Sequence, residues 1–186
     1  DAMGCQKEIA SKIVDKNADY VFGLKRNQGG MYNEVSNLFQ NALETNFEGF
    51  EWDYHKTEEK NHGRYEIRRY WTIKDIEQLS QAKKWSQLRS ICMVESECTC
   101  QGETTRDFRF YISSLDGEAK TVAKAIRSHW GIENSLHWLL DVTFREDDSR
   151  IRKGNAAENF SIIRRLALNL IKQEKSTKKK VLKTSA

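Results

Sequence analysis

The sequence predicts an α/β protein with a β-rich middle. Residues 6–46 pass from a helical pattern to a short apolar run and back to a helical pattern, which is typical of α/β proteins. Residues 47–115 hold several segments rich in aromatic and β-branched residues, as strands are. Residues 116–173 return to the helical spacing of apolar positions.

The first 46 residues are expected to form two helices around one strand. Apolar residues share one face of residues 6–16, and those of residues 31–43 recur with a period near 3.6. Between them, Asp19–Leu24 is a short run of apolar β-branched and aromatic residues, which predicts a buried strand. Lys25–Gly30 follows as a polar loop.

The middle block is expected to form mostly antiparallel strands. Its strand-like segments are separated by turn-like stretches, and they are Phe50–His55, Arg64–Ile73, Ser90–Cys98 and Thr105–Ser113. Lys74–Trp85 carries apolar residues three apart and predicts a short helix.

The last part of the chain predicts two helices. Residues 116–118 (DGE) are a plausible helix start, and Ala125–Asp148 reads as one long helix that runs into an acidic turn. Asn155 is a good N-cap for a helix over Ala156–Gln173. Arg164 and Arg165 lie on the basic side of that helix.

The long helix carries a polar ladder inside an apolar surface. His129, Glu133, His137 and Asp141 are four residues apart and therefore share one face. Apolar residues cover most of the remaining surface, so we expect the helix to be buried. Buried carboxylates and imidazoles must be paired, neutral or bound to a cation.

Three interpretations of this ladder remain open from the residues alone. Glu133 is a candidate ligand in a site for two divalent metals, with Asp1 as a second carboxylate. The alternative is a buried Glu133 that pairs with Arg127 or His137. A zinc site formed by His129, Glu133 and His137 is disfavoured, because the order of a zinc protease helix is absent.

Composition limits the class of protein. With 38% hydrophobic and 31% charged residues, the 186-residue chain suits a globular protein. Neither a membrane-spanning run nor a signal peptide is visible, so we expect a cytoplasmic protein without membrane contact. The net charge is +4, and residues 175–186 form a basic tail with five lysines, which either contacts nucleic acid or is solvated. Because the chain begins at Asp1 without an initiator Met, we expect a fragment.

The cysteines favour free thiols. Cys5, Cys92, Cys98 and Cys100 form no paired C-x-x-C units, which gives little support to structural zinc. We expect them to be reduced, as in cytoplasmic proteins.

Several multi-residue motifs occur in an order that resembles a known family. They are Asp1–Gln6 (DAMGCQ), Tyr20–Gln28 (YVFGLKRNQ), His129–Asn134 (HWGIEN), Leu136–Trp138 (LHW), Leu140–Val142 (LDV) and Arg150–Arg152 (RIR). Together they resemble the bacterial insertion-sequence transposases of the H-repeat-associated type, in the DDE transposase class.

The resemblance implies an α/β fold with an RNase H-like core that is only partly present. Residues 1–46 would form part of this catalytic core, residues 47–115 a β-rich insertion before the Glu-bearing helix, residues 116–174 the C-terminal helices of the core, and residues 175–186 the basic tail. The family's carboxylates are Asp, Asp and Glu, and they bind two Mg²⁺ or Mn²⁺ ions. The second Asp corresponds to Asp1 and the Glu to Glu133, while the first Asp would lie upstream of this chain.

The function implied by the resemblance is metal-dependent cleavage and strand transfer of DNA. The implied partners are transposon ends and target DNA. The resemblance also implies a homo-oligomer that forms on the DNA, in the bacterial nucleoid. This chain alone would be inactive, because it lacks the first Asp. Four residues are candidates near the catalytic site: Arg127, His129, Asn134 and His137. Four others are candidate DNA contacts: Lys25, Arg26, Arg164 and Arg165. Two alternatives remain, a non-catalytic nucleic-acid-binding relic and a metal-independent scaffold.

Overall fold

The computed structural model describes residues 4–61, 63–132 and 138–173. The chain divides into two compact units, Asp1–Arg127 and Ser128–Ala186. The first unit is built on a β-sheet and the second on two helices. The predicted mixture of helices and strands is confirmed.

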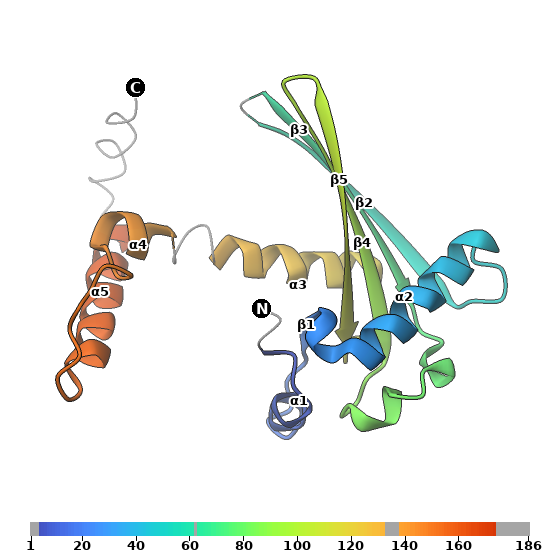
Figure 1. The fold of residues 1–186 in the computed structure, drawn as a ribbon, viewed down its shortest axis with the longest axis horizontal. Helices are drawn as coiled ribbons and strands as arrows, with labels where there is room; N and C mark the ends of the chain where they lie inside the picture. The colour runs from blue at the N-terminus through green and yellow to red at the C-terminus, as the bar shows by residue number, and fades with distance from the viewer. Residues whose placement is uncertain (1–3, 62, 133–137, 174–186) are drawn as a thin grey trace. The chain divides into compact units, whose positions relative to one another are not determined.

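A single antiparallel sheet of five strands forms the first unit (Figure 1). The strand order is β1-β5-β4-β3-β2. The strands are β1 (Val21–Leu24), β2 (Trp52–Asn61), β3 (Arg64–Ile73), β4 (Ser90–Cys100) and β5 (Glu103–Ser113). Strands β2 to β5 form a meander, and β1 pairs with the free edge of β5, with Val21 opposite Ser113. All five predicted strands are confirmed, but the expectation that the first is buried is wrong in part, because β1 is an edge strand and only its Leu24 is buried.

The two predicted N-terminal helices are also confirmed, as α1 (Lys7–Val14) and α2 (Gly29–Glu44). The predicted loop Lys25–Gly30 is wrong in part, because Arg26–Gln28 forms the 3₁₀ turn η2 and α2 already begins at Gly29.

The short helix predicted in residues 74–85 is formed by two separate 3₁₀ turns, η3 (Ile76–Gln78) and η4 (Ala82–Lys84). The three-residue spacing of the apolar residues fits this type of helix, which has three residues per turn.

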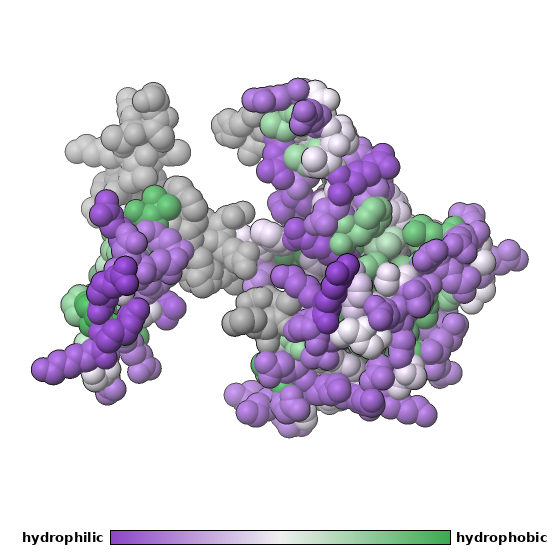
Figure 2. All heavy atoms as spheres, viewed as in Figure 1, coloured by the Kyte–Doolittle hydropathy of each residue, from purple (hydrophilic) through white to green (hydrophobic). Residues whose placement is uncertain are grey.

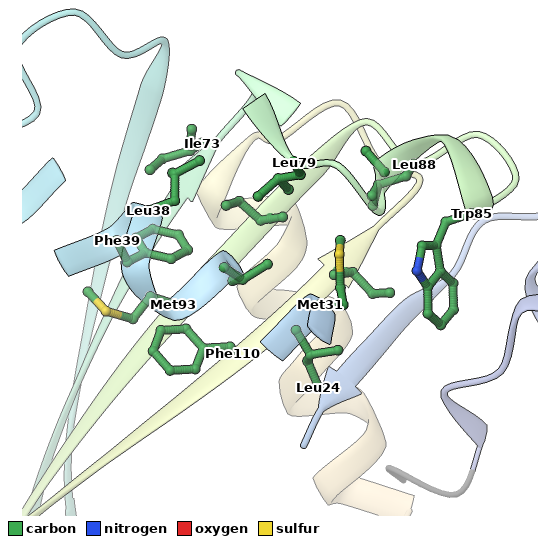
Figure 3. Packing of buried hydrophobic residues seen from close by; sticks show 14 of the residues in the cluster. Leu24, Met31, Leu38, Phe39, Ile73, Leu79, Trp85, Leu88, Met93 and Phe110 are labelled. Carbon is green, nitrogen blue, oxygen red and sulfur yellow. The ribbon is translucent and has the colours of Figure 1, made fainter. Parts of the chain in front are cut away.

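The main core lies between α2 and one face of the sheet (Figure 3). The buried residues of α2 are Met31, Val35, Leu38, Phe39 and Ala42, a spacing that places them on one helix face. The ring of Phe39 stacks on that of Phe110 from β5, with 6.0 Å between the centroids.

The opposite face of the sheet packs against α3 (Ala119–Ile132), which lies behind the strands in Figure 1. The buried residues of α3 are Ala119, Val122, Ala123 and Ile126. Tyr70, Thr72 and Cys92 are fully buried and alternate along β3 and β4 with the residues that face α2. Helices therefore cover both faces of the sheet where Tyr70–Ile73 of β3 lie beside Ile91–Val94 of β4.

The expectation of a helix buried nearly all round is wrong for the described part. Thr121, Lys124, Ser128 and His129 are exposed, because the apolar residues of α3 fall on one face only. The helix begins at Ala119, directly after the predicted start at residues 116–118. A second helix, α4 (Trp138–Phe144), follows, and residues 133–137 lie outside the described ranges, so the continuity of the predicted helix is not tested.

The second unit pairs α4 with α5 (Ala156–Gln173), which begins directly after Asn155 as predicted. Leu140 of α4 and Leu168 of α5 are buried. Large apolar side chains of α5 are exposed by 46–65%: Phe160, Ile162, Ile163, Leu166, Leu170 and Ile171. In the described parts of the chain, no helix is long and apolar enough to cross a membrane.

Four strands continue past the helices as a twisted extension that we call the β-arm (Figure 1). It consists of Lys56–Lys60, Arg64–Arg69, Ser96–Cys100 and Glu103–Arg109. None of its described side chains is buried, and most of its surface in Figure 2 is hydrophilic. The strand predicted to end at His55 continues to Asn61 in β2. The prediction ended too early because Lys56–Asn61 lacks the apolar alternation on which it depended.

Candidate functional site

Helix α3 leads in sequence to Glu133, the predicted metal ligand, and its start is fixed by two strands. The backbone N–H of Ala119 donates to Asp53 Oδ2 of β2 over 2.9 Å. The hydroxyl of Thr72 on β3 donates to the carbonyl oxygen of Gly117 over 2.5 Å. Asp53 thus accepts from one of the first amides of the helix, which have no partner within the helix itself.

Gly117 makes the close approach to the sheet possible. Its φ of +75° lies in the left-handed region that favours glycine. A Cβ atom there would lie 2.9 Å from Lys74 Cγ and 3.2 Å from Ser90 Cβ. The hydroxyl of Ser90 also donates to the carbonyl oxygen of Leu115 over 2.8 Å. The loop before α3 is therefore packed closely on the sheet.

Arg127 connects α3 to the β-arm. Its Nη2 lies 3.0 Å from both carboxylate oxygens of Glu59 on β2. Glu59 also lies 3.4 Å from Nη1 of Arg68. The predicted pairing of Arg127 with Glu133 is not tested, because Glu133 lies outside the described residues.

The end of α3 and the start of α4 carry the other described members of the predicted ladder. His129 is exposed on α3, and Asp141 is half-buried on α4. Four predicted site residues lie outside the described ranges: Asp1, Glu133, Asn134 and His137.

No group of three or more His, Cys, Asp and Glu side chains that could hold a metal ion occurs in residues 4–61, 63–132 and 138–173. The predicted ligands Asp1 and Glu133 lie outside these ranges. The fit of the predicted divalent site thus depends on the chemistry of its donors, which are carboxylates, the ligands that Mg²⁺ and Mn²⁺ prefer.

Lys25 and Arg26, two predicted DNA contacts, are exposed at the start of η2. The side-chain amide of Gln28 at the end of this turn donates to the carbonyl oxygen of Cys5 over 3.0 Å. This bond holds η2 against the first described residues of the chain. Lys25 and Arg26 are therefore on the turn that contacts the segment following Asp1.

The two predicted DNA contacts of α5 differ in their surroundings. Arg165 is exposed. Arg164 is half-buried, with Nη1 3.7 Å from Glu146 Oε1 and its guanidinium carbon 5.9 Å from the centre of the Phe160 ring. Arg164 thus already has intramolecular partners, and Arg165 is the more accessible cation.

The prediction of free thiols is confirmed, because all four cysteines are free. Cys5 is fully buried, and burial raises the pKa of its thiol to about 11. Burial also raises the pKa of the Cys92 thiol. Protonated, buried thiols are poor nucleophiles and poor metal ligands at neutral pH.

The structure adds a feature that the sequence reasoning missed. A hollow of about 480 Å³, here called the α3 hollow, opens between β2 and α3. It is lined by His55, Thr57, Glu118, Lys120, Thr121, Ala123, Lys124 and Arg127. The spacing of Lys120, Lys124 and Arg127 was a visible signal, since residues four and seven apart share a helix face. The contribution of His55 and Thr57 of β2 to the lining depends on tertiary structure and could not be predicted from the sequence.

Comparisons with known proteins agree with the motifs. Residues 1–170 match the family described as the transposase DDE domain. The chain is 43% identical over 182 residues to "Putative transposase YncI" of Escherichia coli O157:H7, which covers 96% of this chain and 46% of that protein. It is 41% identical over 181 residues to "H repeat-associated putative transposase YhhI" of Escherichia coli strain K12, which covers 94% of this chain and 47% of that protein.

The chain thus spans less than half the length of these curated relatives. No solved structure matches the chain.

Proposed function

Because the chain belongs to the family of transposases with a DDE domain, as its motifs predicted, we propose that it supplies part of a catalytic centre for DNA transposition. The reaction is metal-dependent cleavage of DNA at the ends of a mobile element and transfer of the freed strand to target DNA. The observation that carries this proposal is the family match over residues 1–170, which includes both Asp1 and Glu133.

Asp1 and Glu133 would provide carboxylate ligands for two divalent cations, Mg²⁺ or Mn²⁺. Such cations lower the pKa of a bound water and stabilise the leaving oxygen. Arg127, His129, Asn134 and His137 are proposed to contact the scissile phosphate or to orient the ligands. Lys25, Arg26 and Arg165 are proposed to hold the DNA backbone, with Arg164 contributing less because it is engaged with Glu146.

The fold proposed for the whole catalytic domain is RNase H-like, with residues 47–115 as an insertion before the helix that leads to Glu133. The sequence order of α1, β1, the β-rich block and α3 supports this division. Strand β1 of the first segment pairs with β5 of the second, so the two segments share one sheet in this chain.

The longer relatives contain sequence that this chain does not match, and we propose that the first catalytic Asp lies there. On this basis the 186-residue chain does not cleave DNA alone. A complete protein of this family would act on transposon ends and target DNA, as a homo-oligomer assembled on the DNA.

The test uses a relative of full length, purified with DNA that carries the ends of its element. Substituting the counterparts of Asp1 by Asn and of Glu133 by Gln is expected to reduce Mg²⁺-dependent strand cleavage by at least 10³-fold and to leave duplex binding within a few-fold. The counterpart of Glu48, an exposed residue outside the motifs, serves as the control for removing a carboxylate. Undiminished cleavage in either Asp1 or Glu133 variant rejects this assignment. DNA binding by the parent without any metal-dependent cleavage supports the non-catalytic alternative.

A further inference from the structure

We propose that the α3 hollow binds the phosphate backbone of a DNA strand. The proposal rests on the proposed function and adds to it a binding surface formed by β2 and the first two-thirds of α3. Three features of the hollow support DNA binding: its charges, their spacing, and the way in which Arg127 is held.

The hollow carries an excess of positive charge. Its lining includes the three cations Lys120, Lys124 and Arg127 and a single carboxylate, that of Glu118. Lys120, Lys124 and Glu118 are exposed at its rim, while His55 and Thr57 lie on the β2 side. Concave surfaces lined by one sign of charge attract counter-ions more strongly than flat surfaces do. An anion that enters the hollow thus meets cations from the helix and hydrogen-bonding side chains from the strand.

The three cations form a row whose length corresponds to about three phosphate steps of one DNA strand. With a rise of about 1.5 Å per residue, Lys120 and Lys124 lie about 6 Å apart along the helix axis, and Arg127 lies about 4.5 Å beyond. The row is therefore about 10 Å long. Successive phosphates of one DNA strand advance by about 3.4 Å along the duplex axis, so the row matches about three nucleotides. A repeated polyanion fits this arrangement better than a single small anion does.

Arg127 is held in place at one end of the row. Its Nη2 makes both contacts to Glu59, at 3.0 Å each. A guanidinium carries five N–H donors in a rigid plane, so one nitrogen can hold the group against the β-arm while other donors contact a phosphate. Because the orientation is already fixed by Glu59, less conformational freedom is lost when DNA binds.

The test measures binding of the 186-residue chain to a fluorescein-labelled DNA duplex of 20 base pairs by fluorescence anisotropy, in EDTA and at several NaCl concentrations. Because EDTA removes divalent cations, the measurement is independent of strand cleavage. The K120Q/K124Q variant is expected to bind about 10-fold or more weakly at 0.1 M salt, with a slope of log K against log [NaCl] that is shallower by about 1.8, which is two phosphate contacts.

The matched control is K83Q/K84Q, which removes the same charge from two exposed lysines of η4 that do not line the hollow. It is expected to change the affinity by less than about 2-fold. The variant E118Q removes the one carboxylate of the lining and is expected to raise the affinity several-fold. Circular dichroism and urea unfolding establish that each variant is folded.

Three results would overturn the proposal. One is equal weakening by the two lysine pairs, which would mean that net charge alone sets the affinity. Another is the absence of duplex binding by the parent chain. The third is displacement of the duplex by millimolar inorganic phosphate at constant ionic strength, which would identify a site for small anions. If Glu133 variants of a longer relative still cleave DNA while K120Q/K124Q loses duplex binding, the assignment of the catalytic residues fails and the hollow remains a DNA-binding surface.

Discussion

Arg127 of α3 donates from Nη2 to both carboxylate oxygens of Glu59 on β2, at 3.0 Å each. The two residues are 68 positions apart in the sequence, and their contact is an ion pair between α3 and the β-arm. Arg127 stands six positions before Glu133, so a residue next to the proposed catalytic motif is held by the extension of the sheet.

The pair is expected to stabilise the fold only modestly, because the side chains of Arg127 and Glu59 are 38% and 46% exposed. A double-mutant cycle with R127Q and E59Q, measured by urea unfolding, should give a coupling energy of about 0.3–1 kcal/mol. The coupling should fall in 1 M NaCl, where charges are screened beyond about 3 Å. A coupling above about 2 kcal/mol, typical of buried pairs, would contradict this expectation.

Replacing Gly117 by Ala is expected to destabilise the protein by about 2–3 kcal/mol, from left-handed backbone strain of about 1–2 kcal/mol and the contacts of the new Cβ. Those contacts are with Lys74 at 2.9 Å and Ser90 at 3.2 Å. Gly49 is the matched control, because its φ is +81° and nothing lies within 4 Å of its Cβ position. In urea unfolding, G49A should therefore lower the free energy of unfolding only by the backbone strain of about 1–2 kcal/mol. Equal costs for the two variants would show that the close approach at Gly117 is unimportant.

The core between α2 and the sheet should depend strongly on Phe39, which is 1% exposed and stacks on Phe110. F39A is expected to lower the free energy of unfolding by about 3–5 kcal/mol, because it removes a buried ring and leaves a cavity. Phe108, two residues before Phe110 on the same strand, is 50% exposed, and F108A should cost less than about 1 kcal/mol. Chemical denaturation of both variants measures the difference. A loss of less than about 2 kcal/mol in the free energy of unfolding of F39A would show that Phe39 is not central to the core.

The stability of the fold is expected to fall between about pH 9 and pH 11 through Cys5. Burial raises the pKa of this thiol from about 9 to about 11, so the unfolded chain loses its proton first as the pH rises. The contribution of the protonated, buried Cys5 thiol to the free energy of unfolding is therefore complete below about pH 9 and is lost as the pH approaches about 11. Urea unfolding of the parent and of C5A should therefore differ less at pH 11 than at pH 8. C100A, which alters an exposed thiol, is the control and should show no such convergence.

Much of the fold could be predicted from local pattern. Helix α2 was predictable because Met31, Val35, Leu38 and Phe39 repeat at helical spacing against one core. The outer half of β2 was not, because its residues are polar and mostly exposed, and its hydrogen bonds to β3 follow from pairing rather than from apolar alternation. The pairing of β1 with β5 joins residues about 90 positions apart, and no local pattern encodes it.

The candidate site was predictable only as a set of residues. The motifs around Asp1 and Glu133 identified the family, but the partners of α3 come from strands far away in the sequence. Asp53 at the start of the helix and Glu59 beside Arg127 are examples. Their roles arise from the register of β2, which cannot be read from the helix itself.

The β-arm is expected to open locally, before the rest of the sheet unfolds. Cross-strand ion pairs such as those of Glu97 with Arg69 at 3.4 Å and Arg106 at 3.0 Å hold a region without buried side chains among its described residues. Its opening exposes little apolar surface and costs less than unfolding the core. Amide hydrogens of the arm should therefore exchange with solvent by local fraying, while those of β4 near Ile91 exchange only with global unfolding. The sheet is therefore expected to have two levels of cooperativity along the same strands, with local opening of the β-arm at a lower free energy than unfolding of the base near Ile91.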